Sequence, residues 1–243
     1  MKDYTIRHSK KAKHLQLRFS SHGLEVVLPQ KKKISQEKIE AFLEEKKAWI
    51  ARVKKRLLAA PSKLPLSLPT EIELPAIQQK WAVTYLSTLH ARTVNLSCLH
   101  QHIKLWGKTD DKKRCINALK RWLKKTAAYH LSHQLRILSE KHGFVFSTVT
   151  IRQTVSRWGS CSPQKNISLC CNLLFLPPHL VTHVLLHELC HTKHLHHKPS
   201  FWALLEKCDP ESAIHKKSLK HAGDYIPAWA GRMTDAQLED FSA

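Results

Sequence analysis

The chain has 243 residues, of which 42% are hydrophobic and 24% are charged, a composition typical of a globular rather than a disordered protein. Its 40 lysines and arginines outnumber 19 aspartates and glutamates, so the formal net charge is +21 with histidine neutral. The six glycines are too dispersed for a G-x-G-x-x-G sequence or a P-loop, which excludes a glycine-cradled nucleotide. No apolar run approaches the ~20 residues that span a bilayer, and none follows the basic start. We therefore expect a cytoplasmic protein without a signal peptide.

Residues 1–60 are predicted to form an N-terminal lobe of β-strands and a helix. Apolar and polar residues alternate over 15–19 and 24–28, which predicts two strands joined by a turn. From Ser35 to about Leu58, apolar residues recur at helical spacing, and Ser35 is a suitable N-cap.

Residues 61–107 are predicted to be a linker followed by a small β-rich segment. The first ten of these residues include three prolines, which is typical of a linker. Short strands are expected at 81–86, 93–98 and 102–106. Two roles fit this segment, a substrate-guiding lobe or a spacer.

Residues 108–243 are predicted to form a further domain of mixed helices and strands. A long amphipathic helix should run from about Arg114 to His142 and end at a glycine. Strands are expected at 149–154 and 167–171. Together with the N-terminal lobe, this organisation predicts an α+β fold.

The next predicted helix carries the densest histidine cluster among the 18 histidines of the chain. It should begin at Pro177-Pro178 and end near His196, because Pro199 forbids much continuation. A short helix is expected over 200–208. The seven cysteines are odd in number and form no C-x-x-C pair, so we interpret them as reduced thiols that pack as small apolar side chains.

The motif H-E-x-x-H occupies residues 187–191 of this helix. On a helix, His187 and His191 project from one face about one turn apart, so both imidazoles can bind one zinc ion. Glu188 lies beside them, close enough to reach a metal-bound water without binding the metal. The alternative interpretation is a solvated, histidine-rich helix without a metal.

A zinc site of this kind needs a third protein ligand. His194 follows His187 by seven residues, which on a helix places it about 10 Å away along the axis, too far to share one ion. The third ligand must therefore come from beyond the helix, where the chain can fold back. His196 and His197 are the nearest candidates.

Three sequence features together resemble one known family. They are the segment R-W-G-S-C at 157–161, the H-E-L-C-H motif at 187–191, and His197 followed by Phe201 and Trp202. This combination resembles the YgjP-like metallopeptidases, a zincin group similar to the SprT and WLM domains of DNA-repair-linked proteases. The resemblance implies a zincin-like metallopeptidase fold. It also implies a zinc ion bound by His187, His191 and His197, with Glu188 as the catalytic glutamate.

The R-W-G-S-C segment permits two interpretations. In zincins an edge strand near the metal pairs with an extended substrate, and Arg157, Trp158, Gly159 and Ser160 are candidates for substrate binding of this kind. In the alternative, Trp158 is a core residue and Gly159 marks a β-bulge.

Metal-assisted hydrolysis is the chemistry that these residues predict. Three neutral imidazoles leave zinc one open position for water, whose pKa the ion lowers toward ~7. Glu188 would take the proton as the water attacks a carbonyl, and then deliver it to the leaving amine. Arg157, His194 and Tyr225 are candidates for stabilising the oxyanion.

Three functions remain open on the sequence. The first is a zinc metallopeptidase that acts on a peptide or protein substrate. The second is a metal-dependent hydrolase of a phosphoanhydride such as a nucleoside triphosphate. The third is a basic nucleic-acid-binding module with a structural zinc, which an intact Glu188 argues against.

The positive charge is concentrated in two regions of the chain. Most of the excess lies in residues 1–60 and 104–126, where basic clusters could follow a phosphate backbone without reading bases. The alternative is a solvated surface that increases solubility. The candidate nucleic-acid-binding residues are Lys31, Lys32, Lys33, Lys112, Lys113 and Arg114.

Overall fold

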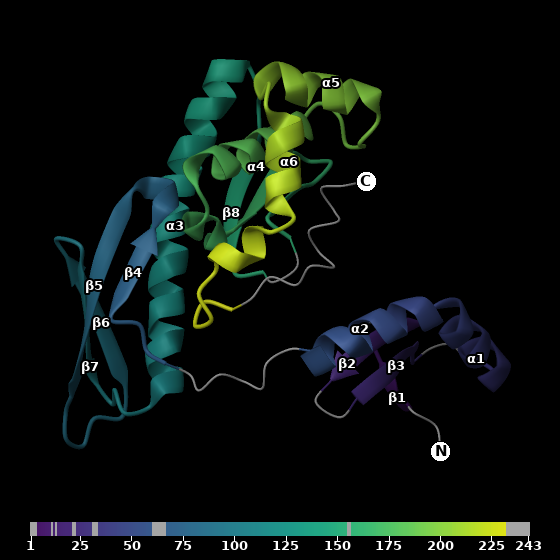
Figure 1. The fold of residues 1–243 in the computed structure, drawn as a ribbon, viewed down its shortest axis with the longest axis horizontal. Coiled ribbons are helices and arrows are strands. Elements are labelled where there is room, and N and C mark those ends of the chain that lie inside the picture. Colours follow the sequence, from purple (N-terminus) through teal and green to yellow (C-terminus); the bar gives the residue numbers. More distant parts are fainter. Residues whose placement is uncertain are drawn as a thin grey trace. The chain divides into compact units, whose positions relative to one another are not determined.

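The structure is a computed structural model in which residues 4–10, 12, 14–20, 23–30, 34–59, 67–154 and 157–231 are described. The chain divides into two compact units, residues 1–64 and 65–243, and each of them contains both helices and strands, so the fold is of the mixed α+β class (Figure 1). None of the described helices is both long and apolar enough to cross a membrane.

The first unit is a three-stranded sheet with two helices. The sheet has the order β1-β3-β2, in which β3 pairs parallel with β1 and antiparallel with β2. Val26, Leu28 and Ile39 form its core. The elements are β1 (Tyr4–Ser9), β2 (Gln16–Ser20), β3 (Gly23–Pro29), α1 (Gln36–Glu45) and α2 (Lys47–Ala59).

Two features of this unit differ from the sequence prediction. Strand β1 was not expected. Tyr4 and Ile6 alternate with polar residues, but this pattern is short and the side chains of the strand are mostly exposed. The single helix expected from Ser35 is two helices, since the backbone at Lys46 leaves the helical conformation. The predicted N-cap is present, and the Ser35 hydroxyl accepts a hydrogen bond from the Lys38 N–H.

The second unit begins with a four-stranded sheet of order β4-β5-β7-β6, in which only the β5–β7 pair is parallel. Its inward side chains, among them Leu74 and Leu105, belong to the same core as Leu119 and Leu123 of the following helix. The described residues of this segment, 67–107, therefore pack in one core with the residues that follow them. The elements are β4 (Glu71–Leu74), a 3-10 turn η1 (Pro75–Ile77), β5 (Gln79–Ser87), β6 (Val94–Leu99) and β7 (His102–Gly107).

Helix α3 (Lys112–His142) forms the centre of this unit. Asp111 caps its first turn by accepting the Arg114 N–H at 3.1 Å, and Gly143 ends it in the left-handed conformation at φ 65°. Figure 1 shows α3 between the β4–β7 sheet and the part of the unit that contains β8 and α4. The predicted long helix is confirmed, with a start two residues earlier.

The remaining elements are a small sheet and the helices that follow it. A small sheet has the order β8-β10-β9, so the short β9 lies at its edge, antiparallel to β10. The elements are β8 (Thr148–Arg152), β9 (Gly159–Cys161), β10 (Asn166–Cys170), the 3-10 helix η2 (Cys171–Phe175), α4 (Pro178–Cys190), α5 (Pro199–Cys208), α6 (Ser212–Leu219) and the 3-10 turn η3 (Ala222–Tyr225).

Helix α4 is shorter than the sequence predicts. It ends at Cys190 rather than near His196, and His191 is its C-cap. The chain then turns, with the N–H groups of Thr192 and Lys193 bonded to carbonyls three residues back. The His191 ring also bonds the His194 carbonyl oxygen at 2.9 Å, which stabilises this turn.

Candidate metal centre

The first two candidate ligands come from the end of α4. Ten of the thirteen residues in this helix are buried, because it carries apolar residues around most of its circumference. His187 and Glu188 are therefore 3% and 2% exposed, although both side chains are polar. His191 follows one turn later at the C-cap. Polar groups in such a position cost free energy unless they bind a partner.

The turn after α4 brings a third imidazole back to these residues. The Nε2 atoms of His191 and His197 each lie 3.1 Å from Nε2 of His187, and the three ligand nitrogens are within 4.8 Å of one another. Of the two adjacent candidates, His197 joins this group, whereas His196 is exposed and accepts the N–H of Lys198 at 3.4 Å.

The donor set fits a zinc ion. With zinc–nitrogen bonds of about 2.0–2.1 Å, tetrahedral geometry separates two ligand nitrogens by about 3.3 Å. The 3.1 Å separations around His187 are close to this value. Three neutral nitrogen ligands and one open position are typical of a catalytic rather than a structural zinc site.

Two aromatic residues of α5 hold the three imidazoles in place. Phe201 is fully buried and lies against all three rings, with centroid distances of 4.9, 4.6 and 4.8 Å to His187, His191 and His197. Trp202 stacks on His197 and donates its indole N–H to the His197 carbonyl oxygen at 2.9 Å. These contacts limit the rotation of the rings, which favours a preorganised site.

The main chain of the turn orients one ligand. The His191 ring has Nε2 in the cluster and Nδ1 2.9 Å from the His194 carbonyl oxygen. A ligand histidine commonly donates its second ring N–H in this way, which fixes the tautomer that binds metal. His194 thus contributes its backbone rather than its side chain.

Burial favours the neutral form of two of the three candidate ligands, His187 and His191. It lowers the pKa of His187 well below the usual value, and the neighbouring His191 and His197 rings lower it further. Burial also lowers the pKa of His191, against the opposing effect of its bond to the His194 carbonyl. Neutral imidazole is the state that coordinates a metal ion.

Glu188 lies beside the ligands and against the edge strand β9. A pocket of about 180 Å³, which we call the metal pocket, is lined by the three histidines, Glu188 and all three residues of β9, and also by Arg157 and Leu195. A Cβ atom added to Gly159 would lie 2.7 Å from both Cγ and Cδ of Glu188, well inside van der Waals contact. The sequence offered Gly159 as a substrate-binding residue or a β-bulge, and it did not predict this contact with Glu188.

The four candidate substrate-binding residues, 157–160, lie in two different environments. Arg157, Gly159 and Ser160 line the metal pocket, whereas Trp158 is completely buried in the core. Trp158 therefore has the burial of a core residue. The neighbouring Cys161 also lines the pocket, and burial, with the charge of Glu188, raises the pKa of its thiol to about 11. At neutral pH this thiol is protonated and is a poor nucleophile.

The three candidates for stabilising the oxyanion also lie in different places, and one of them lines the metal pocket. Arg157 lines the metal pocket. Tyr225 lines a different cavity, together with Phe175 and Trp229. Among the described residues, the group of three candidate ligand nitrogens does not include a nitrogen of the His194 side chain.

A second buried group lies one helical turn below His187. Asp209 Oδ2 is 2.6 Å from Nδ1 of His183 and 2.9 Å from Nδ1 of His215. These distances are those of hydrogen bonds to a carboxylate rather than the separation of about 3.3 Å between two ligands of one zinc ion. The group therefore joins α4, the end of α5 and α6 by hydrogen bonds.

The electrostatics of this group agree with that description. Burial lowers the pKa of His183, although the bond to Asp209 opposes the effect. For Asp209, burial alone would raise the pKa, but the hydrogen bonds from His215 and His183 outweigh it and the pKa is lowered. The sequence did not predict this group. Its only local signal is the four-residue spacing of His183 from His187.

The candidate nucleic-acid-binding residues fall into two sets. Lys31, Lys32 and Lys33 lie outside the described residues. Lys112 and Lys113 are exposed in the first turn of α3. Arg114 is also exposed, but its Nε is 2.9 Å from the Asp111 carboxylate and its Nη1 donates to the Arg92 carbonyl oxygen at 2.7 Å.

Comparison with known proteins places the chain in a family. Neither the curated proteins nor the solved structures contain a match to it. The model of the family described as "YgjP-like, metallopeptidase domain" matches residues 13–222, which include both sheets of the second unit, helix α4 and the three clustered histidines. The chain therefore belongs to the YgjP-like metallopeptidase domain family.

Proposed function

We propose that the protein is a zinc-dependent peptidase whose metal is held by His187, His191 and His197. One observation carries the proposal: three imidazole nitrogens converge on one point beside the buried Glu188 in a chain of a metallopeptidase family. A structural zinc site has no use for a carboxylate at that position, whereas a hydrolytic site needs a general base there.

The roles of the residues follow from their positions. A zinc ion bound here supplies a Lewis acid that polarises a carbonyl group and makes water more acidic. Glu188 takes the proton from the attacking water and passes it to the leaving amine. Its burial at 2% exposure excludes bulk water, which strengthens its interaction with a nearby proton donor.

The edge strand β9 gives a polypeptide substrate a place to bind. Only one edge of β9 is paired within the described structure, with β10. Gly159, Ser160 and Cys161 of this strand also line the metal pocket. An extended peptide that added to the free edge would pass along the pocket, held by main-chain hydrogen bonds. Arg157, which also lines the pocket, is our candidate for stabilising the oxyanion.

A substrate panel tests this function. Zinc-loaded protein is compared with the Glu188→Gln variant on casein, on a mixture of peptides and on nucleoside triphosphates, with and without a chelator. We expect chelator-sensitive peptide cleavage by the wild type only, with the same zinc content in both proteins. Full turnover by Glu188→Gln would contradict the role of the glutamate. Hydrolysis of nucleotides alone would support the phosphoanhydride hydrolase instead.

The exposed lysines of α3 support a second proposal, non-specific contact with a nucleic-acid backbone. Lys112 and Lys113 lie in the exposed first turn of this helix. Such contact weakens steeply as salt increases, because binding releases counterions. The proposal predicts that Lys112→Ala with Lys113→Ala lowers the salt dependence of DNA binding. An unchanged dependence would contradict a role for these two residues.

A further inference from the structure

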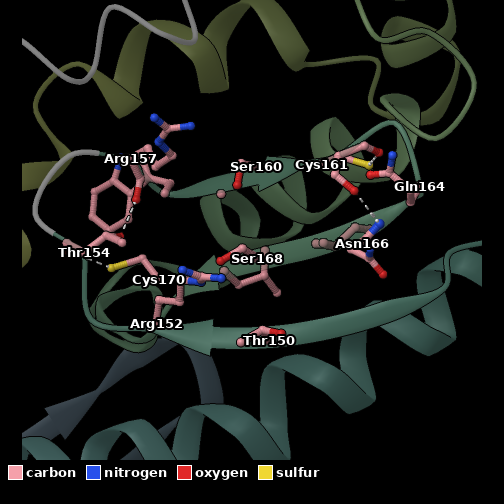
Figure 2. Close-up of a pocket in the computed structure, with 15 residues that line it drawn as sticks. Thr150, Arg152, Thr154, Arg157, Ser160, Cys161, Gln164, Asn166, Ser168 and Cys170 are labelled. Atoms are coloured by element: carbon pink, nitrogen blue, oxygen red, sulfur yellow. Dashed lines mark hydrogen bonds between the residues drawn. The ribbon is translucent and has the colours of Figure 1, made fainter. Parts of the chain in front are cut away.

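The outward face of the small sheet forms a groove (Figure 2). This groove shares lining residues with the metal pocket. The groove has a volume of about 690 Å³ and is lined by β8, β10, β9 and the turn that joins the last two. The opposite face of the sheet carries Ile151, Ile167 and Leu169, which are buried in the core. Because side chains alternate along a strand, the residues next to these three in β8 and β10 point into the groove. They are Thr150, Arg152, Asn166, Ser168 and Cys170.

The strand register places a row of hydroxyl groups across the groove. Ser168 of β10 pairs with Thr150 of β8 on one side and with Ser160 of β9 on the other. Residues paired in this way present their side chains on the same face of a sheet. The groove floor therefore offers three neighbouring hydroxyls, each able to donate a hydrogen bond.

Two arginines give the groove its charge. Arg152 ends β8 and Arg157 precedes β9, and both side chains are exposed. The groove lining contains no aspartate or glutamate. In the described part of the chain, no carboxylate forms a salt bridge with either guanidinium. Figure 2 shows the Arg152 side chain reaching over the sheet face in the direction of Ser168.

The groove and the metal pocket meet along β9. Arg157, Gly159, Ser160 and Cys161 line both of them. Gly159 faces Glu188, whereas Ser160 shares the groove face with Ser168. An extended chain directs successive side chains to opposite faces. A polypeptide that passes β9 can thus present one residue to the metal pocket and its neighbour to the groove.

We propose that this groove binds acidic side chains of the polypeptide substrate, so that cleavage is directed to acidic segments. The inference rests on the proposed peptidase function. A carboxylate accepts paired hydrogen bonds from a guanidinium and further bonds from hydroxyl donors, and this groove supplies both kinds of donor. Its lining residues belong to strands and turns, so the groove lacks the helix N-terminus that typically binds phosphate groups.

Peptide binding by the zinc-loaded Glu188→Gln protein tests the proposal without cleavage. Fluorescently labelled peptides of one length and sequence are compared, with glutamate and aspartate replaced in the second by glutamine and asparagine. Anisotropy should show at least about tenfold tighter binding of the acidic peptide, since hydrogen bonds to charged groups stabilise more than neutral ones. Arg152→Ala and Arg157→Ala should each remove most of this difference, and Arg152→Lys should restore only part of it.

A matched variant separates the groove from the general positive charge of the protein. Arg136 is exposed on α3, outside the groove, and Arg136→Ala removes the same charge. We expect Arg136→Ala to retain the preference for the acidic peptide. Equal weakening by Arg136→Ala and Arg152→Ala would overturn the proposal, and so would equal binding of the acidic and amide peptides. Nucleoside triphosphate that displaces the labelled peptide at a lower concentration than the unlabelled acidic peptide does would assign the groove to phosphate groups. That result would also overturn the proposal.

Turnover measurements distinguish failure of this inference from failure of the proposed function. If the wild type cleaves acidic and amide peptides with equal kcat/KM, the groove proposal is wrong and the peptidase function stands. If acidic peptides bind through Arg152 and Arg157 but no peptide is cleaved, the groove proposal stands and the peptidase function is wrong. For a groove that only binds, Arg152→Ala should raise KM and leave kcat near the wild-type value.

Discussion

Gly159 of the edge strand β9 lies directly against the side chain of Glu188 on helix α4. The missing Cβ is what permits this approach, because an added methyl group would overlap the glutamate side chain. The backbone of Gly159 does not require glycine, since its φ is not among the positive values in the described chain. The residue is therefore constrained by space and not by conformation.

Gly159→Ala should lower peptidase activity while leaving the metal in place. The added methyl group displaces the Glu188 carboxylate or the strand, and small displacements of a catalytic group are costly. We expect kcat to fall at least about tenfold with unchanged zinc content. Double-variant kinetics check the cause: adding Gly159→Ala to Glu188→Gln should produce little further loss. A full additional loss would show that Gly159 acts through something other than Glu188.

Removal of one imidazole should abolish tight metal binding. His197→Ala leaves two ligand nitrogens, and we expect zinc content after dialysis to fall to a small fraction of the wild-type value. His196→Ala is the matched control, because that ring is exposed and outside the cluster. Metal analysis of both variants decides the matter. Loss of zinc from His196→Ala with retention by His197→Ala would contradict the ligand assignment.

Asp209 should contribute strongly to stability. Asp209→Asn removes a charge that accepts two buried hydrogen bonds, and it should lower the free energy of unfolding by about 1–3 kcal/mol. Glu211→Gln is the control, because the Glu211 side chain is exposed and 3.7 Å from the His215 ring; its effect should be within about 0.5 kcal/mol. Denaturant unfolding measures both. Gain of a second zinc ion by the wild type, lost in Asp209→Asn, would show that the group binds metal after all.

The metal-free protein should lose stability as pH falls below about 6.5, the ordinary pKa of histidine. Burial lowers the folded-state pKa of His183, His187 and His191, so the unfolded chain binds more protons in this range. Stability therefore rises with pH up to about 6.5 and is then constant as far as these groups are concerned. Each group contributes at most about 1.4 kcal/mol per pH unit.

Urea unfolding between pH 5 and pH 8 in the presence of a chelator tests this dependence. His187→Gln should reduce the slope of stability against pH below 6.5. His133→Gln, which changes an exposed histidine of α3, should leave the slope unchanged. A wild-type stability that increases as the pH falls from 7 to 5 would contradict the sign of the effect. The lowered pKa of Asp209 affects stability only at lower pH. There the stabilisation that the charged carboxylate gives the folded protein is lost as the carboxylate binds a proton.

The sequence by itself determined the elements whose residues interact locally. The periodicity and end signals of α3 predicted a helix that the structure confirms to within two residues at its start. The strands β5, β6 and β7 were also predicted from local pattern. The spacing of His187, Glu188 and His191 predicted the chemistry that we propose for the site, because neighbours one turn apart on a helix are close whatever the rest of the chain does.

Interactions between residues far apart in the sequence left no local pattern from which they could be predicted. Strand β1 is mostly exposed and β4 has only four residues, so each is defined by its partner strand rather than by its own pattern. The end of α4 at Cys190 depends on the turn that the His194 carbonyl stabilises. From the residues alone, His196 and His197 were equivalent as third ligands, and the resemblance to the family favoured His197.

Only the tertiary structure decided what surrounds the proposed metal ligands. Gly159 faces Glu188, Asp209 joins His183 to His215, and Arg152 shares a groove with Arg157 because separate elements pack together. The physical reason is that helix and strand periodicities follow from local backbone geometry, whereas these contacts depend on how the elements pack. The sequence thus determined which residues have side chains able to bind a metal ion or take a proton from water. The packing of the elements decided which of these side chains lie next to one another.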